Sequence, residues 1–316
     1  MFTFLLTEPI HPAGVQVLEA EGVVRLARGT DEATLFAEML DVDGVVLRAV
    51  GRMTRAVMAG APRLRVIGRH GVGVDNIDLD AATALGIQVV NTPHAVTEGV
   101  VEHTVALLLD VSKRLTYADR RARAGDWDVR YRISGRELRG RTLGVIGFGR
   151  IGRRVAAACH AGFGMRIVYS DVVAAPDLDR DLGARQAPLE ELLRTAEYIT
   201  VHVPLVPETR HLIDERALRA MRPDAILVNC SRGPVVDEAA LYRALSEGWI
   251  AAAGIDVFEQ EPTPKDNPLF GLDNIVVTPH TATATEEALV EMALVARDVV
   301  RVLKGERPEY PVNNIP

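Results

Sequence analysis

The sequence predicts an α/β protein of two Rossmann-like or flavodoxin-like, doubly wound parallel-sheet domains with a cleft between them. Two observations support this fold class. Short apolar runs alternate with polar, helix-like stretches through most of the 316 residues, as they do where helices join parallel strands. A G-x-G-x-x-G turn lies near the middle of the chain, at residues 147–152. A complete α/β unit therefore has room to precede the unit that contains this turn.

The N-terminal part accounts for the first sheet, and its expected strands are four apolar runs: 2–6, 45–47, 64–67 and 87–90. Two long helical patterns follow, from Thr97 to about Arg123 and from Thr285 to about Leu303. Both look like crossings between domains, and we expect the second to return to the first sheet. The predicted domains are therefore residues 1–98 with 285–316, and residues 99–284.

The glycine turn lies between a predicted strand and a predicted helix. The apolar run 142–146 precedes it as a predicted buried strand, and a helix-like stretch follows. Strand, glycine turn and helix form a dinucleotide-binding fingerprint. Gly147 allows a tight turn, Gly149 lets the backbone approach a pyrophosphate, and Gly152 lets the helix pack closely. The pyrophosphate charge then sits at the helix N-terminus, so residues 99–284 are predicted to bind the cofactor.

An acidic residue completes the fingerprint. A second apolar run ends at Asp171, 19 residues after the third glycine. A carboxylate there accepts hydrogen bonds from ribose hydroxyls and repels a 2′-phosphate. The next residues are Val172 and Val173, with no adjacent arginine to bind that phosphate. NAD is therefore favoured over NADP, unless Asp171 is only a turn residue at a strand end.

Composition narrows the function classes. The net charge of −7 argues against general affinity for nucleic acid or anionic membranes. The two cysteines have no metal-type spacing, so no metal site is expected, and they suit the reducing cytoplasm. No apolar run approaches membrane-spanning length, and the run at 2–6 reads as a strand, not as a signal peptide. Nine arginines between 114 and 141 read as a solvated or subunit-facing surface, in preference to an anion-binding strip.

Four apolar runs in the second half end in polar or unusual residues. Because ligands bind outside the carboxyl ends of strands in a doubly wound sheet, we expect these residues to converge on one crevice beside the glycine turn. Each has a bland alternative, such as a surface cation, a polar core residue or a helix cap. The residues are His202, Val203 and Pro204; Asn229, Cys230, Ser231, Arg232 and Gly233; Asp256; and Thr278, Pro279 and His280.

An arginine, a histidine and a carboxylate beside a nicotinamide suit hydride transfer to a 2-oxo acid. A cation must fix the substrate carboxylate, and arginine does so as a bidentate fork. A general acid must protonate the carbonyl oxygen, and histidine is suited to this near neutral pH. A carboxylate close to the histidine would stabilise the imidazolium. Glu259 and Glu261 lie between Asp256 and His280 and are the candidates.

These motifs resemble the D-2-hydroxyacid dehydrogenase family, of the phosphoglycerate dehydrogenase and hydroxypyruvate reductase type. The resemblance covers nearly the whole chain and rests on segments 68–78, 229–233, 256–262 and 278–280. It implies that Arg232 binds the carboxylate, that His280 is the acid and base, and that Glu261, not Glu259, tunes His280. On the substrate side it implies Val72 and Gly73, with Arg232 and His280, and on the cofactor side Arg150, Ile151, Thr209 and Asp256. The strand ends add His202, Val203, Pro204, Cys230 and Ser231 as expected cofactor contacts, and Arg69 is an expected substrate contact.

The resemblance implies a dimer built through the cofactor domain, which suits the arginine-rich segment. It leaves the substrate open among phosphoglycerate, hydroxypyruvate, glyoxylate and bulkier acids, and it leaves the direction of the reaction open. Arg69, His70 and His94 are candidates for further substrate contacts. The alternative from another class is a non-catalytic NAD(H)-sensing corepressor on the same fold. A methylating or hydrolytic enzyme on this fold would need a motif that the chain lacks.

Overall fold

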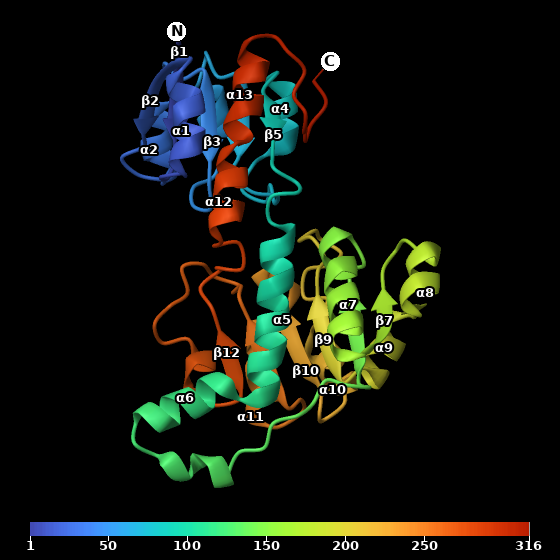
Figure 1. Ribbon diagram of the computed structural model, residues 1–316. Coiled ribbons are helices and arrows are strands. Elements are labelled where there is room, and N and C mark those ends of the chain that lie inside the picture. Colours follow the sequence, from blue (N-terminus) through green and yellow to red (C-terminus); the bar gives the residue numbers. More distant parts are fainter. Residues whose placement is uncertain (316) are drawn as a thin grey trace. The chain divides into compact units, whose positions relative to one another are not determined.

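The computed structural model describes residues 1–315, and the side chains of all of these except 177–179. The chain divides into two compact units. Domain 1 consists of Met1–Val96 with Thr283–Pro316, and domain 2 consists of Thr97–Ala282. Each is built on its own parallel sheet, of five strands in domain 1 and seven in domain 2 (Figure 1). The predicted fold class, two doubly wound parallel-sheet domains, is confirmed.

The sheet of domain 1 has the strand order β2-β1-β3-β4-β5, which is the flavodoxin-like order. Its strands are β1 (Phe2–Leu6), β2 (Gly22–Leu26), β3 (Gly44–Leu47), β4 (Val66–Arg69) and β5 (Gln88–Val90). The sequence prediction missed β2. This strand lies at the edge of the sheet and leaves Val23 and Leu26 about half exposed, so it lacks the continuous apolar run of a buried strand.

Six helices belong to domain 1: α1 (Pro12–Glu19), α2 (Glu32–Glu38), α3 (Arg55–Ala59), α4 (Leu79–Ala84), α12 (Glu286–Ala293) and α13 (Val295–Leu303). The C-terminal helical pattern is divided, because Leu294 separates α12 from α13. As expected, this segment returns to the first sheet. Helix α13 packs on β3 and β4 (Figure 1). There the side chain of Val299 lies so close to Gly68 that a Cβ on this glycine would have no room.

The sheet of domain 2 has the order β12-β11-β10-β9-β6-β7-β8, and all its strands are parallel. The order reverses between β6 and β9, which is the switch point where this fold binds ligands. Its strands are β6 (Thr142–Ile146), β7 (Arg166–Ser170), β8 (Arg185–Gln186), β9 (Tyr198–Val201), β10 (Ile226–Asn229), β11 (Ala252–Ile255) and β12 (Ile275–Val277).

Helix α5 (Thr97–Lys113) covers β10, β11 and β12 and also packs on α7 (Figure 1). The long pattern expected from Thr97 to Arg123 is two helices, because Arg114 adopts a left-handed conformation with φ of 56° and ends α5. The other helices of domain 2 are α6 (Leu115–Arg123), α7 (Arg150–Phe163), α8 (Pro176–Leu182), α9 (Leu189–Thr195), α10 (Glu215–Ala220) and α11 (Glu238–Ser246), with short 3₁₀ turns at Trp127–Tyr131, Gly233–Val235 and Pro268–Gly271.

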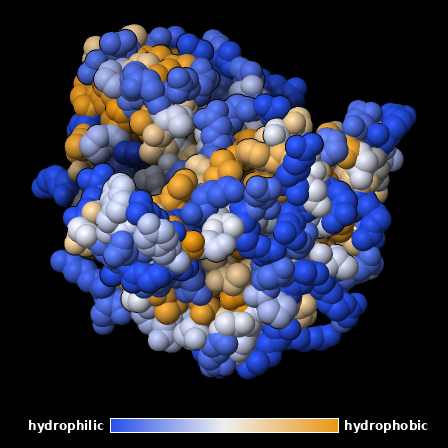
Figure 2. Space-filling model, turned by 60° about the horizontal axis from the view of Figure 1, so that its bottom comes forward, coloured by the Kyte–Doolittle hydropathy of each residue, from blue (hydrophilic) through white to orange (hydrophobic). Residues whose placement is uncertain are grey.

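The surface is mostly polar. The face drawn in Figure 2 is largely hydrophilic, with smaller hydrophobic areas between the charged residues. In domain 2, Leu115, Trp127 and Tyr131 are large apolar side chains that stand out as exposed, with Trp127 68% and Tyr131 73% accessible. Within residues 1–315, no helix combines the length and the apolar composition that crossing a membrane requires.

Candidate active site

His280 and Glu261 form a hydrogen-bonded pair in domain 2. Nδ1 of His280 lies 2.7 Å from Oε2 of Glu261, and Oε1 of Glu261 accepts a hydrogen bond of 2.9 Å from the amide of Phe258. Although burial raises the pKa of Glu261, the hydrogen bonds from His280 and Phe258 and the charges of His280 and Arg232 lower it below its ordinary value. Glu261 is therefore held as an ionised acceptor.

Glu259, the other candidate partner, lies elsewhere. Its Oε1 accepts a hydrogen bond of 3.0 Å from the amide of Glu238 and lies 2.9 Å from Nε2 of His211. Glu261 is thus the glutamate beside His280, and Glu259 joins the start of helix α11 to the loop at His211. Both carboxylates were candidates from the sequence alone, and the fold places them in different surroundings.

Arg232 follows strand β10 and is held by its own turn. Asn229 donates from Nδ2 to the carbonyl of Arg232 at 3.0 Å, and Nη1 of Arg232 donates to the carbonyl of Ser231 at 2.7 Å. The next residue, Gly233, lies so close to Phe258 that a Cβ would come within 1.9 Å of its carbonyl group. This contact brings the arginine segment against the segment that carries Glu261.

Asp256 is fully buried at the end of β11 and organises the histidine loop. Its Oδ1 accepts hydrogen bonds from the hydroxyl of Thr278 at 2.6 Å and the amide of Thr281 at 2.8 Å, and its Oδ2 accepts one from the amide of Ala282 at 3.0 Å. Its carbonyl accepts the amide of His280 at 2.7 Å. These bonds support His280 in a left-handed backbone conformation, with φ of 54°.

The glycine turn has the geometry of a cofactor cradle. Gly147 has a φ of 87°, and a Cβ there would lie 2.7 Å from the carbonyl carbon of His202. A Cβ on Gly152 would lie 2.1 Å from the carbonyl oxygen of Gly147, so helix α7 packs closely on the turn. A Cβ on Gly149, in contrast, meets no atom within 4 Å. Open space therefore remains over the N-terminus of α7, where a pyrophosphate fits.

Asp171 lies against this turn. Its Oδ2 accepts a hydrogen bond of 2.5 Å from the amide of Phe148, and its Oδ1 accepts one of 2.9 Å from the amide of Val173. The ring of Phe148 stacks on Tyr169 of β7 at 4.0 Å between ring centroids. The carboxylate therefore has a local structural task in addition to its predicted contact with a ribose.

The other residues predicted for the cofactor lie at the carboxyl edge of the same sheet or on the adjoining loops. His202, Val203 and Pro204 follow β9, and burial lowers the pKa of His202 to about 4. The hydroxyl of Thr209 donates to the carbonyl of Pro204 at 2.6 Å and closes that loop. Cys230 and Ser231 follow β10, and Arg150 and Ile151 begin α7.

In domain 1, the loop after β4 is held by the residues that follow β5. The side chain of Asn91 donates to the carbonyl of Val72 at 2.8 Å, and the amide of Thr92 donates to the carbonyl of Gly71 at 3.1 Å. Among the residues that the structure describes, none accepts a hydrogen bond from the amide of Val72 or of Gly73. Two adjacent amides of this kind suit a carboxylate.

Arg69 and His70 lie at the end of β4. His70 is buried, and its burial, with the charges of Arg48 and Arg69, lowers its pKa to about 4. Arg69 donates to the carbonyl of His70. Arg48 directly follows β3, the neighbour of β4 in the sheet, and donates from Nη1 to the carbonyl of Pro9 at 2.9 Å.

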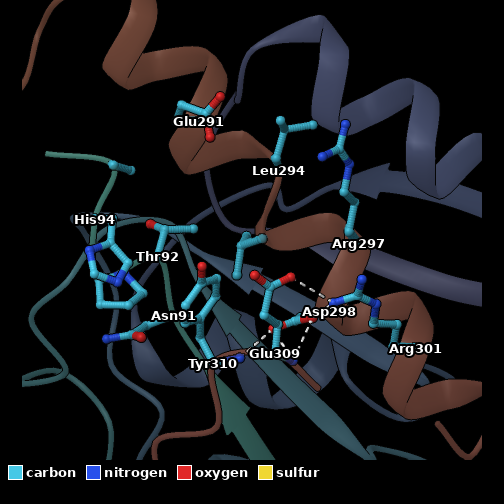
Figure 3. A pocket seen from close by; sticks show the side chains of 13 residues that line it. Asn91, Thr92, His94, Glu291, Leu294, Arg297, Asp298, Arg301, Glu309 and Tyr310 are labelled. Carbon is cyan, nitrogen blue, oxygen red and sulfur yellow. Dashed lines mark hydrogen bonds and ion pairs between the residues drawn. The ribbon is translucent and has the colours of Figure 1, made fainter. Parts of the chain in front are cut away.

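His94 lines a cavity within domain 1 (Figure 3). Its ring meets that of Tyr310 edge-on at 5.7 Å, and the opposite wall comes from α12, α13 and the C-terminal segment. There the carboxylate of Asp298 accepts a hydrogen bond of 2.9 Å from Arg301 and also binds the amides of Glu309 and Tyr310. The cavity contains none of the residues predicted for catalysis.

Comparisons with known proteins show the family of this chain. Residues 105–282 match the model of the D-isomer specific 2-hydroxyacid dehydrogenase NAD-binding domain. The chain belongs to the D-2-hydroxyacid dehydrogenase family. It is 45% identical over 320 residues to a D-3-phosphoglycerate dehydrogenase of Methanocaldococcus jannaschii. That alignment covers the whole of this chain and 60% of the relative's length. It is 46% identical over 283 residues to a glyoxylate reductase of Korarchaeum cryptofilum, which covers 88% of the chain and 85% of that relative.

A solved structure agrees with the family. The D-lactate dehydrogenase of Aquifex aeolicus, in complex with NAD and lactic acid, superposes with a TM-score of 0.88 and 32% identity, over 96% of each chain. The present chain is thus an oxidoreductase with an NAD-binding domain, as the sequence predicted. The relatives named here are enzymes, so they do not support the corepressor alternative.

The present chain has one further residue at this site that the sequence analysis did not identify. His103, on helix α5, places Nε2 2.9 Å from the hydroxyl of Thr278 and 3.5 Å from Oδ1 of Asp256. A histidine in a helical pattern has no distinguishing signal in a single sequence. Among the residues that the structure describes, no group of three or more histidine, cysteine or acidic side chains is placed to hold a metal ion.

Proposed function

We propose that this enzyme interconverts a small 2-oxo acid and its D-2-hydroxy acid with NAD, and that Arg232, His280 and Glu261 carry the reaction. The observation behind this assignment is the 2.7 Å contact between His280 Nδ1 and Glu261 Oε2. A cation, a histidine and an ionised carboxylate in one part of the site are what reduction of a carbonyl beside a carboxylate requires.

His280 exchanges a proton with the substrate oxygen. Because ionised Glu261 can only accept hydrogen bonds, the proton between them belongs to Nδ1 of His280. Nε2 is then the nitrogen that gives a proton to the carbonyl oxygen in reduction and takes one from the hydroxyl in oxidation. Glu261 fixes the orientation of the ring through this hydrogen bond.

Arg232 binds the substrate carboxylate and polarises the carbonyl. A guanidinium offers a forked pair of donors that matches a carboxylate. The bond from Nη1 to the carbonyl of Ser231 supports one side of the group. The amides of Val72 and Gly73, and Arg69, are proposed as further substrate contacts.

Bound NAD supplies or takes the hydride. The residues that would hold it belong to domain 2. The turn at Gly147, Gly149 and Gly152 and the start of α7 at Arg150 and Ile151 would bind the pyrophosphate. Asp171 would bind the ribose and favour NAD over NADP, and Asp256 would bind the nicotinamide amide. The remaining cofactor contacts are proposed at His202, Val203, Pro204, Thr209, Cys230 and Ser231.

The substrate is proposed to be glyoxylate, hydroxypyruvate or the 3-phosphorylated form of hydroxypyruvate. The relatives named above are a glyoxylate reductase and a D-3-phosphoglycerate dehydrogenase. The test is NADH oxidation with each of these 2-oxo acids, and with bulkier 2-oxo acids as comparison. We expect reduction of at least one of the three. NADH binding without turnover of any acid in the panel would contradict the proposal and favour the sensing alternative.

We also propose a homodimer that forms through domain 2, and a cytoplasmic location. The dimer is supported by the exposed Leu115, Trp127 and Tyr131 in the arginine-rich segment. The location is supported by Cys159 and Cys230, which are both buried free thiols. Light scattering should give twice the monomer mass and should give the monomer mass after a joint Trp127→Ser and Tyr131→Ser replacement. A monomeric wild-type protein would contradict the dimer.

A further inference from the structure

Within the part of the chain that the structure describes, His103 is the side chain of helix α5 that forms a hydrogen bond to the strand ends carrying Asp256 and His280. Its Nε2 lies 2.9 Å from Oγ1 of Thr278, and that oxygen lies 2.6 Å from Oδ1 of Asp256. The three groups form a continuous chain of hydrogen bonds. The chain begins on the helix that covers β10, β11 and β12 and ends on a fully buried carboxylate.

The direction of the hydrogen bonds in this chain follows from proton counting. Although burial raises the pKa of Asp256, hydrogen bonds from His103, Thr278 and the amides of Thr281 and Ala282 lower it below its ordinary value, so the carboxylate is ionised. The hydroxyl of Thr278 then donates its single proton to Asp256. Toward His103 the hydroxyl can only accept, and Nε2 of His103 must be the donor.

The consequence is a carboxylate fixed in one orientation. Oδ1 of Asp256 receives the hydroxyl of Thr278 and the amide of Thr281, and Oδ2 receives only the amide of Ala282. Oδ2 therefore has the greater remaining acceptor capacity, and a nicotinamide amide that reached this fully buried side chain would bond there. If the hydroxyl of Thr278 turned toward His103, the donor on Oδ1 would be lost and the orientation of the carboxylate would no longer be unique.

We propose that His103 is a positioning residue for the nicotinamide half of the cofactor site. It donates from Nε2 to Thr278, and through Thr278 it holds the carboxylate of Asp256 ready for the nicotinamide amide. This inference rests on the proposed role of Asp256. It concerns only the nicotinamide end, since the adenosine half is assigned to the turn at 147–152 and to Asp171.

The test compares two ligands of the same protein by titration calorimetry: NADH, which contains the nicotinamide, and ADP-ribose, which does not. We expect His103→Ala to raise the Kd of NADH about tenfold and to leave the Kd of ADP-ribose within twofold, since one hydrogen bond to a charged network is lost. His103→Gln, whose Nε2 can also donate, should return NADH binding to within about threefold of wild type. Glu102→Ala, an exposed neighbour on the same helix, is the matched control.

Catalysis supplies a second measurement. A misplaced nicotinamide should lower kcat of His103→Ala in 2-oxo acid reduction more than it raises the KM of the acid. Thr278→Val should reproduce the NADH effect, and combining it with His103→Ala should add less than the sum of the two, because both remove one chain. An unchanged Kd of NADH in His103→Ala, or equal losses for NADH and ADP-ribose, would overturn the proposal.

Asp256→Asn distinguishes a failure of the role proposed for Asp256 from a failure of the positioning role proposed for His103. If this variant binds NADH as the wild type does, the proposed role of Asp256 is wrong and the role of His103 falls with it. If Asp256→Asn weakens NADH binding but His103→Ala does not, only the positioning role is wrong. Should Asp256→Asn fail to fold, Thr278→Val, which keeps the shape of its side chain and removes one donor to Asp256, replaces it: an unchanged Kd of NADH in this variant would overturn the proposal.

Discussion

The carboxylate of Asp171 supports the glycine turn directly: its Oδ2 accepts a 2.5 Å hydrogen bond from the amide of Phe148, the residue between the first two glycines. The same carboxylate directly follows β7, where a dinucleotide-binding fold places the acid that contacts the ribose. Asp171 therefore combines support of the turn with the negative charge that would select the cofactor.

Two substitutions at Asp171 distinguish charge from support. Asp171→Asn keeps an acceptor for the Phe148 amide and removes the charge, whereas Asp171→Ser removes both. We expect both to lower the ratio of kcat/KM for NADH to that for NADPH by about tenfold or more, because a 2′-phosphate is no longer repelled. Asp181→Asn, an exposed carboxylate of the same domain, is the control. An unchanged ratio in both variants would remove Asp171 from cofactor selection.

The second and third glycines of the turn should respond in opposite ways to alanine. A Cβ on Gly152 meets the carbonyl of Gly147 at 2.1 Å, so Gly152→Ala should lower the free energy of unfolding by roughly 1–3 kcal/mol or more. A Cβ on Gly149 meets nothing within 4 Å, so Gly149→Ala should keep its stability but lose NADH affinity, since the methyl group enters the space for the pyrophosphate. Denaturant unfolding and NADH titration measure the two effects. Equal stability of both variants would contradict the packing account.

Two buried histidines should make the enzyme sensitive to mild acid. Burial lowers the pKa of His202 to about 4, and burial with the charges of Arg48 and Arg69 lowers that of His70 to about 4, from an ordinary 6.5. Between these values the unfolded chain binds more protons than the folded one, so stability falls as the pH falls from 6.5 toward 4. Each histidine contributes up to about 3 kcal/mol to that loss.

The check is the pH dependence of unfolding for single replacements. His202→Gln and His70→Gln should each flatten the decline of stability between pH 6.5 and 4, whatever they do to stability at pH 8. Carboxylates with lowered pKa, such as Glu261, add their own loss at still lower pH, where they become protonated. A slope identical to the wild type in both variants would show that these side chains do not titrate in this window.

The two neighbouring glutamates offer a matched pair of substitutions. Glu261→Gln keeps an acceptor for the Phe258 amide but replaces the ionised acceptor of His280. We expect kcat for 2-oxo acid reduction to fall roughly 10²-fold, because the ionised acceptor that orients the ring of His280 is lost. Glu259→Gln, whose carboxylate faces His211 and the start of α11, should change kcat by less than about threefold. Similar losses in both variants would contradict the separate roles.

Much of the fold could be predicted from the sequence, because buried parallel strands are continuous apolar runs that end in distinctive residues. Strand β6 was expected at its observed bounds, 142–146, and β9, β10, β11 and β12 end at or directly before the polar residues that were expected to follow them. The edge strand β2 was missed, because its exposed positions interrupt the apolar run. The break at Arg114 was also missed, since a left-handed arginine has no local signature comparable to that of a glycine.

The site was predictable only in part, for a physical reason. Strand ends and glycines are local features, so Asp256, His280 and the turn at 147–152 could be found without coordinates. The contacts of His103 and the separation of Glu259 from Glu261 depend on which loop each side chain faces, which follows from the packing of distant segments. The roles assigned to these residues remain predictions that the experiments above address.

The central claim is that His280 is the acid and base of hydride transfer to a 2-oxo acid. The most direct measurement is the single-turnover rate of NADH oxidation by His280→Ala, with the most active acid of the panel, alongside the Kd of NADH. The account predicts a rate roughly 10²–10⁴-fold below wild type with an unchanged Kd of NADH. A rate within a few-fold of wild type would contradict it.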